Sequence, residues 1–160
     1  MEQNPEKTYI SAEILFGVIN EELEAGRKAS FIVTGQSMWP FLCHGRDSVT
    51  IERVRFEELQ RGDIVLLRTP MHTYMLHRIT ALGENRFETA GDGNCSRDGW
   101  FDRDCLLART VSVRRKGKTI SCSSVRWKFI SAVWMKLFFV RPGLLKLCLD
   151  ISKIKGRLGK

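Results

Sequence analysis

The sequence has few features of a secreted, disulfide-bonded or metal-binding protein. Its five cysteines are an odd number, lie far apart and include no Cys-x-x-Cys pair: Cys43, Cys95, Cys105, Cys122 and Cys148. This pattern fits neither a disulfide framework nor a zinc site, so we expect reduced thiols, no bound metal and no cofactor. Residues 1–7 contain neither a basic segment nor an apolar run, so we expect no secretory signal and predict a cytoplasmic location.

Acidic residues are scarce in the last third of the chain. From Arg109 onward the sequence holds 14 of its 26 Lys and Arg residues but only one of its 18 acidic residues, a balance of +13. Residues 1–108 have a balance of −5, so an acidic body carries a basic tail. This asymmetry is more informative than the overall net charge.

The length of 160 residues fits one domain, and an apolar content of 43% is enough for a core. Residues 8–26 repeat apolar side chains at three- and four-residue intervals, which predicts a helix that ends at Gly26. Short apolar or alternating runs then predict strands at 31–33, 48–54, 64–68, 74–79, 86–90 and 105–113, with a loop at 91–99. The sequence therefore predicts a mainly β domain over residues 29–122 after a helical segment over 1–28.

Residues 123–160 mix large apolar and basic side chains on both sides of Pro142-Gly143. We expect two amphipathic helices separated at this break, with too many charges to cross a membrane. Basic residues beside aromatic and leucine side chains are typical of a helix that lies in an anionic membrane interface. The predicted membrane contacts are Trp127, Trp134, Phe138, Lys136 and Arg141.

Two other interpretations of this tail are open to the sequence. It can be a helical pair that packs on the sheet with its basic residues in solvent. It can also bind nucleic acid, but its aromatic and leucine content favours a membrane or a protein groove, so we expect no nucleic acid partner.

Ser37 follows a short apolar run and a glycine. Residues 31–33 predict a buried strand, Gly35 permits a sharp turn, and Met38 is expected to anchor that turn in the core. A serine on a tight turn is where a hydroxyl nucleophile can stand with its backbone N–H directed at the attacked carbonyl. Taken alone, the same residues also fit a strand that runs into an ordinary loop.

A histidine and two aspartates follow in an order that serine chemistry can use. His77 lies in the predicted strand 74–79, and Asp92 and Asp98 lie 15 and 21 residues later. A serine hydroxyl needs a neighbouring base, and the imidazole that suits pH 7 needs an acceptor on its other nitrogen. Taken alone, His77 fits a buried histidine bonded to a carbonyl, and the aspartates fit turn residues.

Four motifs carry a resemblance to a known family. They are Gly35-x-Ser37-Met38-x-Pro40-x-Leu42, Arg61-Gly62-Asp63-Ile64-Val65, Leu76-His77-Arg78-Ile79 and Thr89-Ala90-Gly91-Asp92-Gly93-Asn94. In this order, over roughly residues 31–113, they resemble the signal peptidase I and LexA-like serine peptidase superfamily. A histidine stands where the bacterial signal peptidases and LexA-like proteins have a lysine. The chain is therefore most similar to the Ser-His signal peptidases of the endoplasmic-reticulum and archaeal type.

The resemblance implies a LexA- or signal-peptidase-like β fold and a serine endopeptidase that cleaves a peptide or a leader or precursor segment. Carried over by position, Ser37 is the nucleophile, His77 the base and Asp98 the third member. Asp92 is the alternative third member, or a residue that shapes its loop. The rival expectation is a catalytically inactive peptide-binding or membrane-tethering module of the same fold.

Two departures from the family pattern affect these expectations. The Gly-Asp after the nucleophile has one inserted residue, as Gly45-Arg46-Asp47, so we expect a different turn there. We expect the helix at 8–26 to stand in place of the membrane anchor of the signal peptidases. We therefore expect a cytoplasmic enzyme that rests on the inner face of the membrane through residues 124–160.

Overall fold

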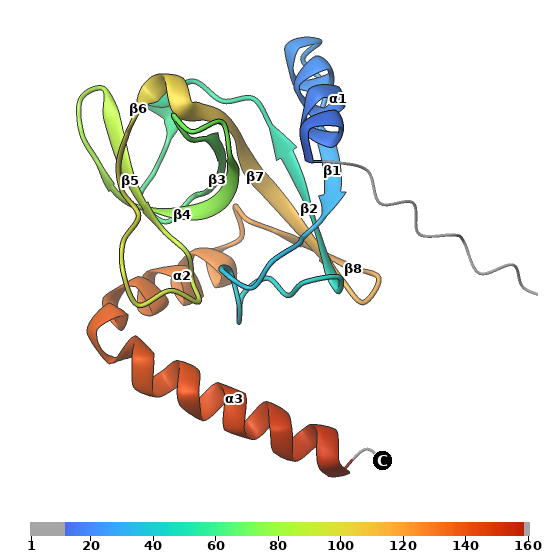
Figure 1. The fold of residues 1–160 in the computed structure, drawn as a ribbon, viewed down its shortest axis with the longest axis vertical. Coiled ribbons are helices and arrows are strands. Elements are labelled where there is room, and N and C mark those ends of the chain that lie inside the picture. The colour runs from blue at the N-terminus through green and yellow to red at the C-terminus, as the bar shows by residue number, and fades with distance from the viewer. Residues whose placement is uncertain (1–11, 159–160) are drawn as a thin grey trace, which may run out of the picture.

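The chain forms an antiparallel sheet with helices at both ends of the sequence (Figure 1). The computed structural model describes residues 12–158, so positions 8–11 of the expected first helix lie outside the described residues. The elements are α1 (Ala12–Glu24), β1 (Ala29–Ile32), β2 (Asp47–Glu52), η1 (Phe56–Glu58), β3 (Ile64–Arg68), β4 (Tyr74–Leu82), β5 (Arg86–Ala90), β6 (Gly99–Asp102), η2 (Arg103–Cys105), β7 (Leu106–Arg115), β8 (Lys118–Ser121), α2 (Val125–Lys136), η3 (Phe138–Val140) and α3 (Arg141–Leu158).

The eight strands lie in the order β1-β2-β7-β3-β4-β5-β6, and β8 pairs with β7. Every pairing is antiparallel. Register shifts interrupt the pairing of β2 with β7, of β3 with β7 and of β4 with β5. Such irregularities bend a sheet, and Figure 1 shows β3, β4, β5 and β7 curving around a common centre. The expected mainly β architecture with an N-terminal helix and C-terminal helices is confirmed.

Strand β3 joins the two parts of the apolar core. Its side chains alternate, so Ile64 and Leu66 contact a cluster that includes residues of α1 and β1, whereas Val65 and Leu67 contact a cluster around Phe87. These four side chains of β3 are at most 2% exposed. Burial of one such side chain contributes roughly 2 kcal/mol, so this strand stabilises both halves of the sheet.

Two strands lie outside the ranges that the sequence predicts. β6 begins at Gly99, the last residue of the expected loop, and β8 follows a tight turn in which Lys116 and Gly117 have φ values of 48° and 77°. Each strand has four residues, and most of the side chains of β8 are exposed. Neither has enough apolar side chains for the alternation that marks a half-buried strand.

The C-terminal helices separate at a different place from the one expected. α2 ends at Lys136 and α3 begins at Arg141, so Pro142 and Gly143 lie in the first turn of α3 and not between the helices. Proline is tolerated in a first turn because the N–H groups there have no partner within the helix. The expectation of a helix break at Pro142-Gly143 is therefore wrong, because the break lies about one turn earlier, between Lys136 and Arg141.

Three of the five predicted membrane contacts are buried against the domain. Trp127 and Trp134 are each 9% exposed, and Arg141 is 2% exposed. Both indole rings pack against Phe41, with ring centroids 5.9 and 5.5 Å apart. The expectation that these three side chains meet lipid is wrong. An indole ring fits the core as well as it fits a bilayer, and the guanidinium of Arg141 is buried beside the ring of Trp134.

The other side of the tail is apolar and faces solvent. Of the remaining predicted contacts, Lys136 is exposed and Phe138 is half-buried. The exposed large apolar side chains of the tail are Val125, Phe129, Ile130, Val133, Phe139, Val140, Leu147, Leu149 and Ile151. Within residues 12–158, no helix is both long enough and apolar enough to span a bilayer.

Asp47 holds the turn that leads into β2. Its buried carboxylate accepts hydrogen bonds from the side chains of Arg46 and Arg115 and from the backbone N–H of Cys43. Burial by itself raises the pKa of Asp47, but these three hydrogen bonds and the charge of Arg115 outweigh it and hold the pKa well below its usual range. Arg46 thus serves as a partner of Asp47.

Asp47→Asn is expected to lower the free energy of unfolding by about 2 kcal/mol near neutral pH, because a charged acceptor of several hydrogen bonds is lost. The pKa of this carboxyl is lower in the folded than in the unfolded chain. Its contribution is therefore present above about pH 5 and is lost as the pH falls below about 4. Urea unfolding of both proteins at several pH values should show the difference shrinking in acid. Asp150→Asn, at an exposed position, is the control, and a difference that grows in acid would contradict the prediction.

Candidate active site

The turn that carries Ser37 is held by its backbone and by two buried side chains. Gly35 has φ of 85°, which residues with a side chain rarely adopt, and its N–H donates to Nδ1 of His44 over 3.1 Å. Met38 and Leu42 are 2% and 0% exposed, so the expected anchoring by Met38 is confirmed. Ser37 itself is half-buried, and the turn therefore holds it at the edge of the core.

His77 lies in the middle of β4 and is 6% exposed. Its Nδ1 lies 2.6 Å from Oδ2 of Asp98, and the hydroxyl of Thr89 donates to the same carboxylate oxygen over 2.7 Å. The backbone N–H of Asp98 donates to the carbonyl of Thr89 over 2.8 Å, which ties Asp98 to the end of β5. A carboxylate beside Nδ1 favours the tautomer with its proton on that nitrogen, which leaves Nε2 as a proton acceptor.

The loop at 91–94 lies directly against the Ser37 turn. The N–H of Gly93 donates to the carbonyl of Ser37 over 2.7 Å. A Cβ atom on Gly91 would lie 2.5 Å from that carbonyl oxygen, and one on Gly93 would lie 2.8 Å from the carbonyl oxygen of Trp39. Only glycine fits at such separations, so the two backbones meet with no side chain between them.

The segment from Gly91 to Asp98 therefore links the three candidate residues Ser37, His77 and Asp98. Ser37 contacts Gly93 near the start of this segment, and Asp98 at its end contacts His77. Among residues 12–158, neither the hydroxyl of Ser37 nor Nε2 of His77 has a hydrogen-bond partner. The two groups that would exchange the proton in a serine mechanism are thus both available for a new hydrogen bond.

Asp92, the other aspartate that the sequence offers, has a different partner. Its two carboxylate oxygens accept hydrogen bonds from Arg78 over 2.8 and 2.7 Å, and both side chains are 1% exposed. Arg78 also donates to the carbonyl of Gly62 and to the hydroxyl of Ser131 in α2, each over 2.9 Å. Asp92 therefore shapes the loop through a buried ion pair, and it is Asp98 that meets His77.

Arg141, the first residue of α3, holds the same loop from the C-terminal helices. Its Nη1 donates to the carbonyls of Gly91 and Asn94 over 3.2 and 3.3 Å, and its guanidinium lies over two aromatic rings of the tail. Burial lowers the pKa of Arg141, and the charge of Asp92 opposes that shift. The start of α3 is thereby tied to the segment that contacts Ser37.

Sequence reasoning missed the parts played by Thr89, Arg78 and Arg141. Thr89 and Arg78 lie within the motifs that also contain Asp92 and His77, so their position in those motifs is the signal that could have found them. Arg141 has no such signal. A basic residue that follows a run of aromatic and apolar ones looks the same in a sequence whether it faces lipid or a carbonyl.

Comparison with models of known protein families finds no match, and neither does comparison with curated protein sequences. Within the described range 12–158, no group of three His, Cys, Asp or Glu side chains could hold a metal ion. The interpretation of the site therefore depends on the contacts among its own residues.

Gly91→Ala is expected to destabilise the fold by at least about 2 kcal/mol, because the new Cβ would overlap the backbone of the Ser37 turn. Urea unfolding measures the effect. Gly143→Ala is the matched control, since a Cβ at that position has no atom within 4 Å apart from its chain neighbours and the backbone of its own helix, and alanine favours the helix. Equal stabilities of wild type and Gly91→Ala would show that the loop does not pack on the turn as described.

Proposed function

We propose that the protein is a serine endopeptidase of the signal-peptidase and LexA-like type, acting on a peptide or on a leader or precursor segment of a protein. Ser37 is the nucleophile, His77 the general base, and Asp98 orients the imidazole. The observation that carries the proposal is the 2.6 Å contact between Nδ1 of His77 and the Asp98 carboxylate, which itself accepts a hydrogen bond from Thr89. The four motifs in family order support the same assignment.

In the proposed reaction, Nε2 of His77 takes the proton of Ser37 Oγ as this oxygen attacks the scissile carbonyl. The backbone N–H of Ser37 stabilises the negative oxygen of the tetrahedral intermediate. His77 then gives its proton to the leaving amine, and the C–N bond breaks to leave an acyl-enzyme. Water hydrolyses the ester by the same proton transfers and restores the serine hydroxyl.

In this proposal, substrate binding must bring the hydroxyl of Ser37 within hydrogen-bond distance of Nε2 of His77. Within residues 12–158 the hydroxyl of Ser37 has no hydrogen bond to His77. Catalytic hydrogen bonds are often long in a free enzyme and tighten only with substrate. The same observation is what favours the second candidate function, a catalytically inactive module of this fold that binds a peptide without cleaving it.

A fluorophosphonate probe with mass-spectrometric readout tests the peptidase. We expect the wild type to be labelled on Ser37, Ser37→Ala to be unlabelled, and His77→Ala to be labelled at least about 100-fold more slowly because the base is gone. Asp98→Asn should also slow labelling, since the imidazole loses the carboxylate that orients it.

Ser96→Ala and His72→Asn are the matched controls for this labelling, because both side chains are exposed and neither has a hydrogen bond to Ser37, His77 or Asp98. Circular dichroism verifies the fold of each variant. Folded wild-type protein that neither reacts with the probe nor cleaves any member of a random peptide library would contradict the peptidase and favour the inactive peptide-binding module.

We also propose that the tail rests on an anionic membrane surface, so that the enzyme works at the inner face of the cell membrane. Phe129 of α2 and Phe139 of η3 are 68% and 90% exposed, and the exposed Lys136 and Lys146 lie in α2 and α3 of the same tail. Large apolar side chains beside basic ones suit the interface of a bilayer with negative headgroups.

Flotation with phosphatidylglycerol vesicles tests this partner. The double variant Phe129→Ser/Phe139→Ser should bind at least about 10-fold more weakly than wild type, because two large side chains no longer enter the interface. Met71→Ser, at a side chain that is 86% exposed in the turn between β3 and β4, is the control. Equal binding of the double variant and wild type, or stronger binding to phosphatidylcholine, would contradict the proposal.

A further inference from the structure

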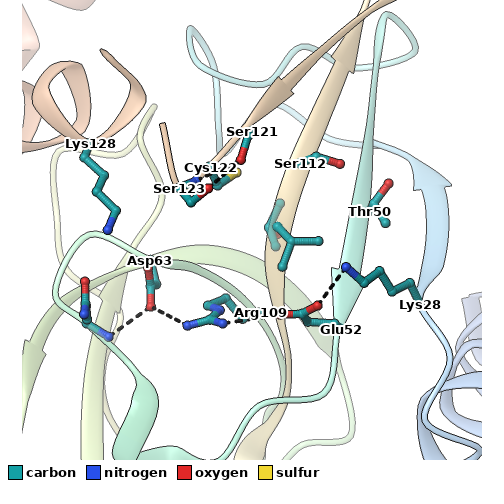
Figure 2. A pocket seen from close by; sticks show the side chains of 13 residues that line it. Lys28, Thr50, Glu52, Asp63, Arg109, Ser112, Ser121, Cys122, Ser123 and Lys128 are labelled. Carbon is teal, nitrogen blue, oxygen red and sulfur yellow. Dashed lines mark hydrogen bonds and ion pairs between the residues drawn. The ribbon is translucent and has the colours of Figure 1, made fainter. Parts of the chain in front are cut away.

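A cavity of about 490 Å³ lies outside the candidate active site. Figure 2 shows it on the side of β2 and β7 that carries Thr50 and Ser112, between Lys28 and the segment that links β8 to α2. In β2, the alternate residues Val49 and Ile51 are buried in the core. Ser37, His77 and Asp98 are not among the residues that line this cavity, which we name the charged pocket.

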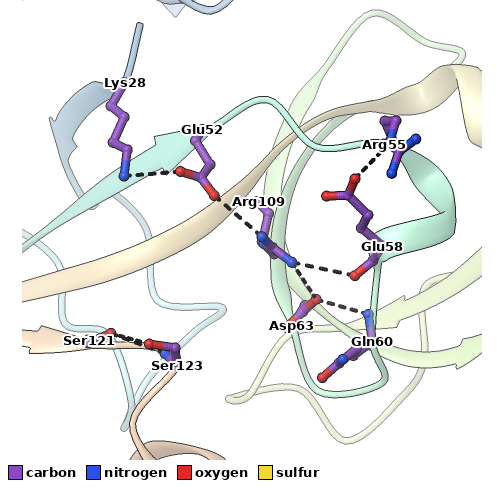
Figure 3. Close-up of polar contacts among 9 residues, drawn as sticks. All are labelled: Lys28, Glu52, Arg55, Glu58, Gln60, Asp63, Arg109, Ser121 and Ser123. Atoms are coloured by element: carbon purple, nitrogen blue, oxygen red, sulfur yellow. Dashed lines mark hydrogen bonds and ion pairs between the residues drawn. The ribbon is translucent and has the colours of Figure 1, made fainter. Parts of the chain in front are cut away.

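The floor of the charged pocket is a line of paired charges. Nζ of Lys28 lies 3.1 Å from Glu52, and Nη2 of Arg109 lies 3.3 Å from the other oxygen of Glu52 (Figure 3). Nη1 of Arg109 lies 3.9 Å from Asp63, which also accepts a hydrogen bond from the N–H of Gln60 over 2.9 Å. Each carboxylate of the floor therefore already has a cation beside it.

Burial raises the pKa of Glu52, but hydrogen bonds from Lys28 and Arg109 outweigh it and lower the pKa below its usual value. Glu52 therefore stays ionised at neutral pH. Burial raises the pKa of the Cys122 thiol in the wall to about 11. Cys122 is thus a neutral group, and the charges that a ligand meets come from the basic and acidic side chains.

One basic side chain that lines the pocket, Lys128, has no ion-pair partner among the described residues. Three basic and two acidic side chains line the space, a balance of +1. Lys128 on α2 makes no hydrogen bond or ion pair with its side chain among residues 12–158, and Figure 2 shows it extended toward the end of the pocket where Asp63 lies. The positive charge that remains after the floor has paired is therefore that of Lys128.

The rest of the wall is rich in hydroxyl groups. They belong to Thr50, Thr110, Ser112, Ser121 and Ser123. The Thr110 hydroxyl is buried and has no hydrogen-bond partner among the described residues, and Ser112 makes no side-chain hydrogen bond there either. Such a wall offers hydrogen-bond donors and acceptors to a hydroxylated ligand.

We propose that the charged pocket binds a small hydroxylated organic anion. The ammonium of Lys128 meets the phosphoryl or carboxylate group, and the serine and threonine side chains meet the hydroxyls. The volume lies within the range of small-molecule sites. The positive balance favours an anion over a cation. Phosphoryl and carboxylate groups share the chemistry that an ammonium recognises.

Isothermal titration calorimetry with the full chain tests the proposal, using glucose 6-phosphate, gluconate and neutral glucose as probes. We expect at least one of the two anions to bind with a Kd below about 1 mM and glucose to bind at least about 10-fold more weakly. Binding of glucose 6-phosphate alone assigns a phosphoryl group, binding of gluconate alone a carboxylate, and binding of both the shared anion chemistry.

Lys128→Ala should weaken anion binding at least about 10-fold, because a charge-assisted contact is lost. Lys136→Ala, which removes the same charge from the same helix outside the pocket, is the matched control. Ser112→Ala should weaken binding a few-fold, whereas the exposed Ser96→Ala should not. Failure of both anions to bind with a Kd below about 1 mM, or equal affinities of Lys128→Ala and Lys136→Ala, would overturn the proposal. The readout is independent of peptidase activity.

Discussion

The buried ion pair between Arg78 and Asp92 is the interaction on which the candidate site depends. Removal of one partner from such a pair leaves an uncompensated charge in the core, at a cost of about 3–5 kcal/mol. Arg78 follows His77 directly in β4, and Asp92 lies in the loop that contacts the Ser37 turn. One contact therefore holds the backbone of the proposed base and the loop beside the proposed nucleophile in a single arrangement.

The C-terminal helices contribute to that arrangement from outside the sheet. Ser131 of α2 accepts a hydrogen bond from Arg78, and Arg141 of α3 donates to two carbonyls of the 91–94 loop. The same tail carries exposed apolar residues such as Phe129 of α2 and Phe139 of η3. A partner that binds these exposed residues would thus contact the same segment that is hydrogen-bonded to Arg78 and to the 91–94 loop.

Much of the fold could be predicted where side-chain pattern and burial agree. β3 and β5 have the bounds that the sequence predicts, because each is a run of apolar or buried residues between turn signals. β6 and β8 could not be predicted, since backbone pairing with β5 and β7 forms them while most of the side chains of β8 stay exposed. Local pattern does not record pairing between distant strands.

The sequence by itself determined the mainly β architecture, the flanking helices and the order of Ser37, His77 and the two aspartates. Only the tertiary structure decided which aspartate meets the imidazole, and which aromatic and basic residues of the tail are buried. The physical reason is the same in both cases. Carboxylates look alike in a sequence, as do apolar side chains, and their partners are set by three-dimensional packing between segments that lie far apart along the chain.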